Sequence, residues 1–195
     1  MELGLARKIL ATNALDDEGS FYGPAVGLSL GTGLIISDVP IPIFNREQGR
    51  FSVAAATVYI LSHECDLDPE NDKVLGGYCL VCPLLPIEEM VSSAVAANLS
   101  QNEISAFLGN LAARRVSRFV YLPPVEGASM GAVLNLNQIT STALSTIDVK
   151  KAVIAVSRYG LEAIDMGLEN HLRRAKSEAL PLTMAPLRKS RSVRG

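Results

Sequence analysis

The feature that most constrains the fold is a series of short apolar runs interrupted by glycine, proline and acidic turns. The run at 27–44 (GLSLGTGLIISDVPIPIF) is rich in Ile, Val and Leu, and its prolines favour β-strands near a sheet edge over a helix. The runs at 55–67 (AATVYILSHECDL) and 78–85 (YCLVCPLL) are typical of strands buried on both faces. The polar segment 44–52 (FNREQGRFS) is expected to be a loop. These runs predict a mostly β domain.

Three other segments have helical spacing. Residues 3–14 predict a short N-terminal helix, and 87–113 predicts a helical insertion in which Ser100 precedes Glu103 in the pattern of a capping box. The segment 157–175 predicts an amphipathic helix with one apolar stripe, formed by Leu161, Ile164, Leu168 and Leu172. Strand character returns between the insertion and the last helix, at RFVYLPPV and GAVLNLNQIT. The expected fold class is therefore mostly β with added helices (α+β).

Length and composition set the domain organisation. The 195 residues, 48% of them hydrophobic and 19% charged, are enough for one domain with a full core but not for two large ones. We expect an N-terminal helix at 1–20, a single domain at 21–176 and a basic flexible tail at 177–195. No apolar run approaches the about 20 residues that cross a membrane, and the first residues lack the pattern of an export signal. We therefore expect a cytoplasmic protein with no membrane contact and with its three cysteines reduced.

The charge is distributed unevenly along the chain. Residues 173–195 hold seven Lys or Arg and one acid, which leaves 18 − 7 = 11 basic and 20 − 1 = 19 acidic residues upstream. A tail of this composition is typical of a solvated extension. The alternative interpretation is electrostatic contact with nucleic acid or an acidic partner. The candidate nucleic-acid-binding residues of the tail are Arg188, Lys189, Arg191 and Arg194.

The segment 59–86 concentrates the residues that carry chemistry, and three interpretations stay open for them. A zinc site would use His63, Cys65, Cys79 and Cys82, but Cys79 and Cys82 are three apart in an apolar strand and point to opposite faces. We therefore expect no bound metal and no cofactor. A nucleophile site would use Cys65 with His63 as its base, although the neighbouring acids raise a thiol pKa.

The third interpretation is structural. Buried cysteines commonly fill positions that Val or Ile would also fit, which suits Cys79 and Cys82. Cys65 and Asp66 end the predicted strand, and the Asp66 side chain is suited to bonding the backbone amides of the loop that follows. Asp66 and Arg50 are the polar residues that we expect in any pocket.

Five short motifs, taken in order along the chain, resemble the PemK/MazF-like toxin superfamily. Residues 62–66 (SHECD) also match the Ser-x-x-Cys-Asp signature of a divergent group of similar barrels. The five motifs are REQGR (46–50), YILS (59–62), VCPLL (81–85), LNQIT (136–140) and VSRYGLEAIDMGL (156–168). The resemblance covers roughly residues 30–90 and 118–175.

The resemblance implies an SH3-like β-barrel with a helical insertion at 87–113 and the closing helix at 157–175. It implies a toxin-like or defence-associated nucleic-acid-binding protein, a divergent ribonuclease with RNA as substrate, a homodimer, and a protein partner such as an antitoxin. Family members cleave RNA without metal, using an Arg that Arg50 matches and a hydroxyl at a position that is Leu85 here. Candidate catalytic residues are Arg50, Asp66, Cys65 and His63. The alternatives are a non-catalytic protein-interaction module and a Cys65/His63 enzyme or zinc-binding protein.

Overall fold

The computed structural model describes residues 3–14, 18–24, 29–45, 48–68, 70, 77–125 and 127–173. Within these ranges the chain is α+β, with an eight-stranded antiparallel sheet and six α-helices. The expected mostly β fold with added helices is confirmed at this level. None of the helices in the described ranges combines the length and apolar character needed to cross a lipid bilayer.

The strands are β1 (Tyr22–Gly23), β2 (Leu34–Asn45), β3 (Arg50–Ile60), β4 (Tyr78–Pro86), β5 (Phe119–Leu122), β6 (Ala132–Asn135), β7 (Thr140–Ala143) and β8 (Ala152–Val156). The α-helices are α1 (Leu3–Asn13), α2 (Glu18–Phe21), α3 (Glu64–Leu67), α4 (Ile87–Ala96), α5 (Gln101–Ala112) and α6 (Arg158–Leu172). Three short 3-10 helices, η1 (Leu136–Gln138), η2 (Leu144–Thr146) and η3 (Val149–Lys151), lie on either side of β7.

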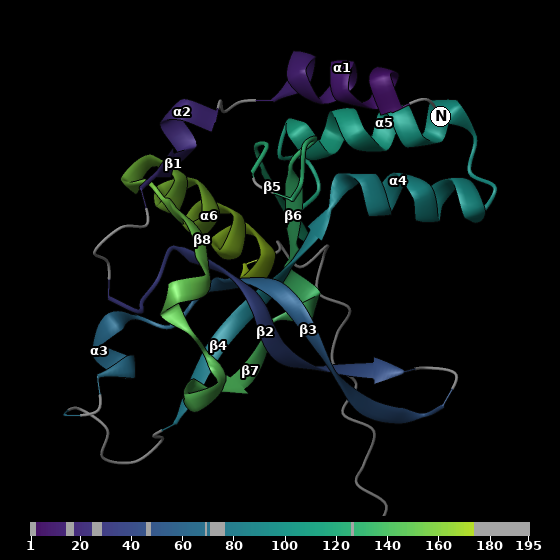
Figure 1. Cartoon of the computed structure of the whole chain (residues 1–195). Coiled ribbons are helices and arrows are strands. Elements are labelled where there is room, and N and C mark those ends of the chain that lie inside the picture. Colours follow the sequence, from purple (N-terminus) through teal and green to yellow (C-terminus); the bar gives the residue numbers. More distant parts are fainter. Residues whose placement is uncertain are drawn as a thin grey trace, which may run out of the picture.

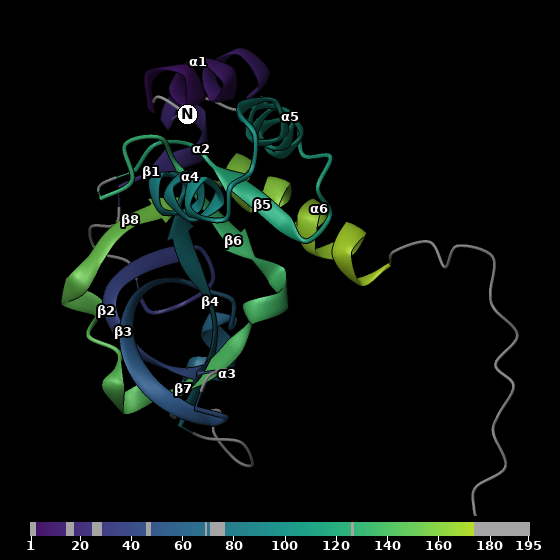
Figure 2. The ribbon, with the colours of Figure 1, turned by 90° about the vertical axis from the view of Figure 1, so that its right-hand side faces the viewer.

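The sheet is open and strongly curled. Its strand order is β1-β8-β2-β3-β4-β6-β5, and β7 pairs with β4 beside β6. Seen from the end in Figure 2, strands β2, β3, β4 and β7 bend round toward one another. The curl brings β7 back to β2, where the Thr142 hydroxyl donates a hydrogen bond to the Pro40 carbonyl at 2.6 Å.

Strand β4 connects the two parts of the sheet because it pairs first with β7 and then with β6. Residues 78–81 pair with β7, and residues 84–86 pair with β6. Cys79 belongs to one buried cluster and Cys82 to another, so both faces of β4 are covered in the middle of the strand, whereas Tyr78 and Leu80 at its start are exposed. The apolar sequence around Val81 and Cys82 follows from burial on both faces.

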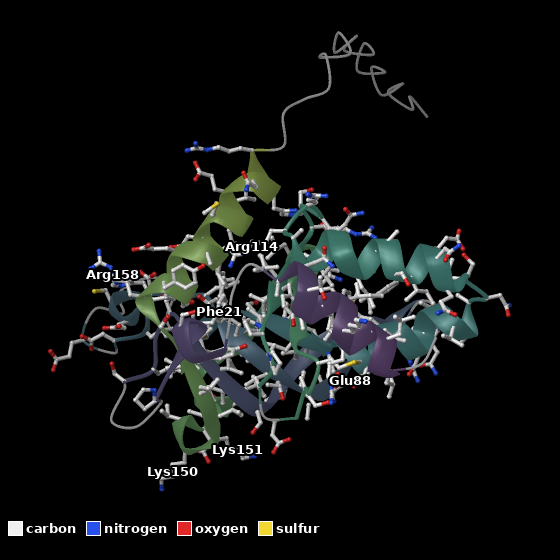
Figure 3. The ribbon with its side chains drawn as sticks, turned by 90° about the horizontal axis from the view of Figure 1, so that it is seen from above. Phe21, Glu88, Arg114, Lys150, Lys151 and Arg158 are labelled. Atoms are coloured by element: carbon white, nitrogen blue, oxygen red, sulfur yellow. The ribbon has the colours of Figure 1, made fainter. Side chains whose placement is uncertain are left out.

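Helices α1, α4 and α5 form a layer at one end of the sheet, shown at the top of Figure 1. A polar contact fixes this layer to the loop before β6. Glu88, at the start of α4, accepts hydrogen bonds at Oε1 from Ser129 Oγ at 2.8 Å and from the Met130 amide at 2.9 Å. Arg7 of α1 donates to the same Ser129 hydroxyl at 3.3 Å, and Figure 3 shows Glu88 seen from above near this helix.

The predicted capping box and the predicted start of the last helix are both confirmed. Ser100 caps α5 and Glu103 reaches back to the Ser100 amide, so the capping box is confirmed. The last helix begins after Ser157, whose side chain accepts a hydrogen bond from the Gly160 amide and donates one to the Ser20 carbonyl.

Two predicted boundaries were wrong. Much of the segment 44–52 is strand, because β2 runs to Asn45 and β3 starts at Arg50, and Gln48 and Gly49 lie in a turn. We call Pro40–Asn45 and Arg50–Ala55 together the β2–β3 arm. A cross-strand aromatic pair stabilises the pairing of β2 and β3 within this polar segment, because Phe44 lies opposite Phe51 with ring centroids 5.2 Å apart. The second error concerns residues 64–67, which form the short helix α3, capped by His63, instead of continuing β3.

Candidate functional site

The α3 corner, residues 62–67, holds three of the four predicted catalytic residues. The ladder between β3 and β4 ends at Leu61, whose amide donates to the Leu80 carbonyl at 2.9 Å. The Ser62 hydroxyl then accepts a hydrogen bond from the Leu80 amide at 2.8 Å. Because a side chain takes the place of the backbone acceptor, the strand stops there and the chain turns into α3.

His63 is the N-cap residue of α3. Its Nδ1 accepts a hydrogen bond from the Cys65 amide at 3.2 Å, and its carbonyl accepts one from the Asp66 amide at 3.0 Å. His63, Cys65 and Asp66 are all exposed. His63 therefore caps a helical turn and does not lie beside Cys65 on one face of a strand. The geometry shows a local structural role for His63, because its Nδ1 is engaged by the Cys65 backbone amide.

Arg50 lies at the other end of β3. The 11 residues of β3, at about 3.3 Å each, separate Arg50 from the α3 corner by at most about 35 Å along the strand. Figure 1 shows the arm at the lower right and α3 at the left. The exposed Arg50 side chain donates from Nε to the Gln48 amide oxygen at 2.8 Å. The structure therefore brings His63, Cys65 and Asp66 together and leaves Arg50 apart from them.

Cys79 and Cys82 are fully buried on opposite faces of β4, as their spacing predicted. Burial raises the pKa of the Cys82 thiol to about 12 and also raises the pKa of Cys79. Both thiols are therefore protonated at neutral pH and fill the core. Among the residues that the structure describes, no three His, Cys, Asp or Glu side chains come close enough together to hold a metal ion.

The predicted nucleic-acid contacts of the tail, Arg188, Lys189, Arg191 and Arg194, lie outside the described residues.

A concave surface built partly from predicted motifs lies beside the β2–β3 arm and has a volume of about 490 Å³. We call it the arm groove. Its wall combines strand residues of the arm, the middle of β4 and the polar turn before β7. The lining residues are Ile41, Pro42, Ile43, Phe44, Phe51, Ala56, Pro83, Leu84, Leu85, Asn137, Gln138, Ile139 and Thr140.

Aromatic rings and amide side chains are the distinctive groups of the arm groove. Phe51 is 71% exposed and Phe44 is 51% exposed, although most aromatic residues of a folded chain are covered. Asn137 and Gln138 are also exposed, in the turn that the Asn135 side chain fixes by accepting the Asn137 amide at 3.2 Å. The groove can therefore offer stacking surfaces and hydrogen-bonding amides to one ligand.

The electrostatics of the arm groove are close to neutral. None of its lining residues is ionisable, and Arg50, next to Phe51 in β3, is the cation nearest to it along the strand. Lys150 and Lys151 project from η3 before β8 (Figure 3), where Lys151 pairs with Asp38 at 3.4 Å. The basic residues of the described part thus form no continuous path along the groove.

Sequence reasoning missed Phe44, Phe51, Asn137 and Gln138 as site residues. A usable signal was present: two phenylalanines flank a polar turn in a chain of only 5% aromatic residues. Comparison of the chain with protein-family models, curated proteins and solved structures finds no match.

Proposed function

We propose that this chain is a toxin-like or defence-associated nucleic-acid-binding protein that holds single-stranded RNA in the arm groove. One observation carries the proposal: two of the segments that resemble the PemK/MazF-like superfamily, and the residue that follows another, line this groove. Pro83–Leu85 belongs to the VCPLL motif, Asn137–Thr140 belongs to the LNQIT motif, and Phe51 directly follows the REQGR motif (46–50). Segments up to 90 residues apart in sequence meet at one concave surface, which is typical of a binding site.

The fold proposed with this function is an SH3-like barrel. Strands β2, β3, β4 and β7 follow one another as antiparallel neighbours, and β8 returns to pair with β2. The Thr142–Pro40 hydrogen bond brings β7 close to β2 between these pairings. A meander whose last strand returns to its first is the connectivity expected of a small barrel.

Single-stranded RNA suits the groups in the groove better than a duplex does. Unpaired bases stack on aromatic rings and present their edges to amide side chains, whereas a double helix hides both features. Phe44 and Phe51 supply the rings, and Asn137 and Gln138 supply donors and acceptors. Arg50 beside them is placed to contact a backbone phosphate.

If the groove also cleaves the RNA that it binds, the protein is a ribonuclease. Transesterification needs a proton shuttle and charge stabilisation. Arg50 is suited to stabilise charge, but the lining residues include no general base and Leu85 carries no hydroxyl. Binding is therefore the primary function proposed, and metal-independent cleavage depends on Arg50. The homodimer and an antitoxin-like protein partner belong to the same proposal.

The test measures binding of a fluorescent single-stranded RNA of about 12 nucleotides by anisotropy. Loss of one stacked base costs about 1–3 kcal/mol, so Phe51→Ala should weaken binding about tenfold or more, whereas Phe51→Tyr should bind nearly as wild type. Tyr78→Ala is the matched control, because Tyr78 is 66% exposed at the far end of β4. Equal affinity of wild type and Phe51→Ala would reject the groove as the RNA site.

The salt dependence of RNA affinity distinguishes phosphate contacts made by Arg50 in the arm from those made by the basic tail. Removal of one phosphate contact in Arg50→Ala should reduce the slope of log K against log salt by about 0.7, whereas Arg158→Ala on α6 should leave it unchanged. A variant with Arg188, Lys189, Arg191 and Arg194 all changed to Ala measures the contribution of the tail. Binding that depends on this variant and not on Phe51 would contradict the proposal. Cleavage with chelator present that disappears in Arg50→Ala would establish the ribonuclease.

A further inference from the structure

A second cavity lies in the helical layer, away from the arm groove. It has a volume of about 260 Å³ and is lined by residues of α4, α5 and the start of β5. Figure 2 shows α4 and α5 end-on with β5 beside them. We call this cavity the helix pocket. The motifs that resemble the toxin superfamily do not include these segments, so the pocket is separate from the proposed RNA site.

The helix pocket is apolar at its floor and along its wall. The floor is formed by Val91, Ile104 and Leu108, which are buried in the core of the helical layer. In the wall, Phe107 and Phe119 are only partly buried, and their rings meet edge to face with centroids 6.0 Å apart. This contact holds the two rings in place. The pocket therefore offers preformed apolar surface to a ligand with a hydrocarbon body.

Arg118 supplies a positive charge at the edge of the pocket. Of the described residues that line the pocket, all are apolar except Arg118 and Glu103. The guanidinium carbon of Arg118 lies 4.9 Å from the centroid of the Phe119 ring, which supports it from below by a cation–π contact. Arg118 is exposed, and it forms no ion pair with any residue in the described ranges. A guanidinium in this state is suited to bind a carboxylate through two parallel hydrogen bonds.

Glu103, the other charged residue of the lining, is already engaged. Its Oε2 accepts hydrogen bonds from the Ser100 hydroxyl at 2.6 Å and from the Ser100 amide at 2.8 Å. These hydrogen bonds belong to the capping box of α5 and lower the pKa of the Glu103 carboxyl. The Glu103 carboxylate is therefore fixed at the start of α5, which leaves Arg118 to select the charge of a ligand.

We propose that the helix pocket binds a small amphipathic carboxylate, with its hydrocarbon chain on the apolar floor and its carboxylate on Arg118. Charge complementarity selects the anion, and the apolar lining selects the hydrocarbon chain. The chain is short, because a volume of about 260 Å³ holds about nine groups of the size of a water molecule or a methylene. Octanoate matches this size. The proposal does not rest on RNA binding, so its test needs no RNA.

Isothermal titration calorimetry with different head groups on one hydrocarbon chain tests the charge assignment. Octanoate should bind with a dissociation constant of about 50 µM, which is within the range for a ligand of about ten heavy atoms. Octanol and octylamine should bind about tenfold more weakly, because neither accepts the paired hydrogen bonds of a carboxylate. Hexanoate should also bind about tenfold more weakly, because it buries two fewer methylenes. Tighter binding of octylamine than of octanoate would assign the charge selection to Glu103 and overturn the proposal.

Two pairs of variants locate the ligand. Arg118→Gln should weaken octanoate binding about five- to tenfold and leave octanol binding unchanged, whereas Arg115→Gln, at an exposed arginine outside the pocket, should bind as wild type. Ala94→Phe fills the pocket from α4 and should weaken octanoate binding at least about tenfold, and Ala96→Phe on the exposed side of the same helix is its matched control. The arginine pair changes no core packing, so it decides the test if Ala94→Phe fails to fold. Wild-type affinity for octanoate in Arg118→Gln would overturn the proposal.

Methyl NMR of the methionines reports the position of the ligand in the unmodified chain. Met90 lines the pocket, whereas Met166 lies on α6 and is 54% exposed. Octanoate should shift the Met90 methyl signal until the site is saturated and leave the Met166 signal unchanged. A shift at Met166 without one at Met90 would contradict the proposed site. Binding of an uncharged apolar helical peptide, with no response to octanoate up to about 1 mM, would identify a protein-docking groove and likewise overturn the proposal.

Discussion

The buried thiol of Cys82 makes a quantitative prediction about stability at alkaline pH. The unfolded thiol ionises near its ordinary pKa of 9, whereas burial raises the pKa in the folded chain to about 12. Above pH 9 the unfolded chain loses a proton that the folded chain keeps, so rising pH favours unfolding. One such group changes the free energy of unfolding by about 1.4 kcal/mol per pH unit, which amounts to about 2–3 kcal/mol between pH 9 and pH 11.

The assay compares wild type with Cys82→Ala in urea unfolding at pH 8, 9, 10 and 11. At pH 8 the variant should be less stable by about 1 kcal/mol, because removing sulfur from a packed strand leaves a small cavity. At pH 11 the order should reverse, with the variant more stable by about 1–2 kcal/mol. Cys65→Ala controls for the loss of an exposed thiol and should differ from wild type by the same amount at every pH. A constant difference between wild type and Cys82→Ala from pH 8 to pH 11 would refute the reasoning.

Two further substitutions test how the core is packed. The Tyr59 hydroxyl is buried with no hydrogen-bond partner among the described residues, and burial raises its pKa above the ordinary value. Removing this unsatisfied polar group in Tyr59→Phe should raise the free energy of unfolding, measured in urea titrations, by about 1 kcal/mol. A loss of stability instead would reveal a partner for the hydroxyl. Gly131 has a φ of 87°, and a Cβ there would collide with the Leu122 carbonyl, so Gly131→Ala should cost about 3 kcal/mol. At Gly49, where φ is also positive but the space is open, the same change should cost about 1 kcal/mol.

Local sequence signals predicted the elements whose causes are local. The Ser100–Glu103 capping box sets the start of α5 through contacts three residues apart. The stripe of α6 depends on spacing within one helix and is confirmed for Leu161, Ile164 and Leu168, whereas Leu172 at its end is 78% exposed. The spacing of Cys79 and Cys82 is enough to place them on opposite faces of a strand. Each of these predictions needs only the geometry of one regular element.

The end of β3 could not be predicted in this way. The segment 55–67 is rich in strand-forming residues, but the strand ends because Ser62 accepts the amide of Leu80, 18 residues away. His63 then caps α3. The segment with His63, Cys65 and Asp66, predicted as a strand, is therefore a helical turn with its N-cap. Its side chains do not lie on one face of a strand, which the nucleophile hypothesis assumed for His63 and Cys65.

The sequence by itself determined the α+β class, helices α4, α5 and α6, and the burial of the β4 cysteines, because propensity, periodicity and capping act over a few residues. Only the tertiary structure decided where the site residues lie. It placed Arg50 at the start of β3 and Cys65 in the helix that follows the end of this strand, since β3 runs unbroken between them. It also joined residues 41–44, 83–85 and 137–140 in one groove, because the curl of the sheet depends on pairings between strands far apart in the chain, which no local pattern encodes.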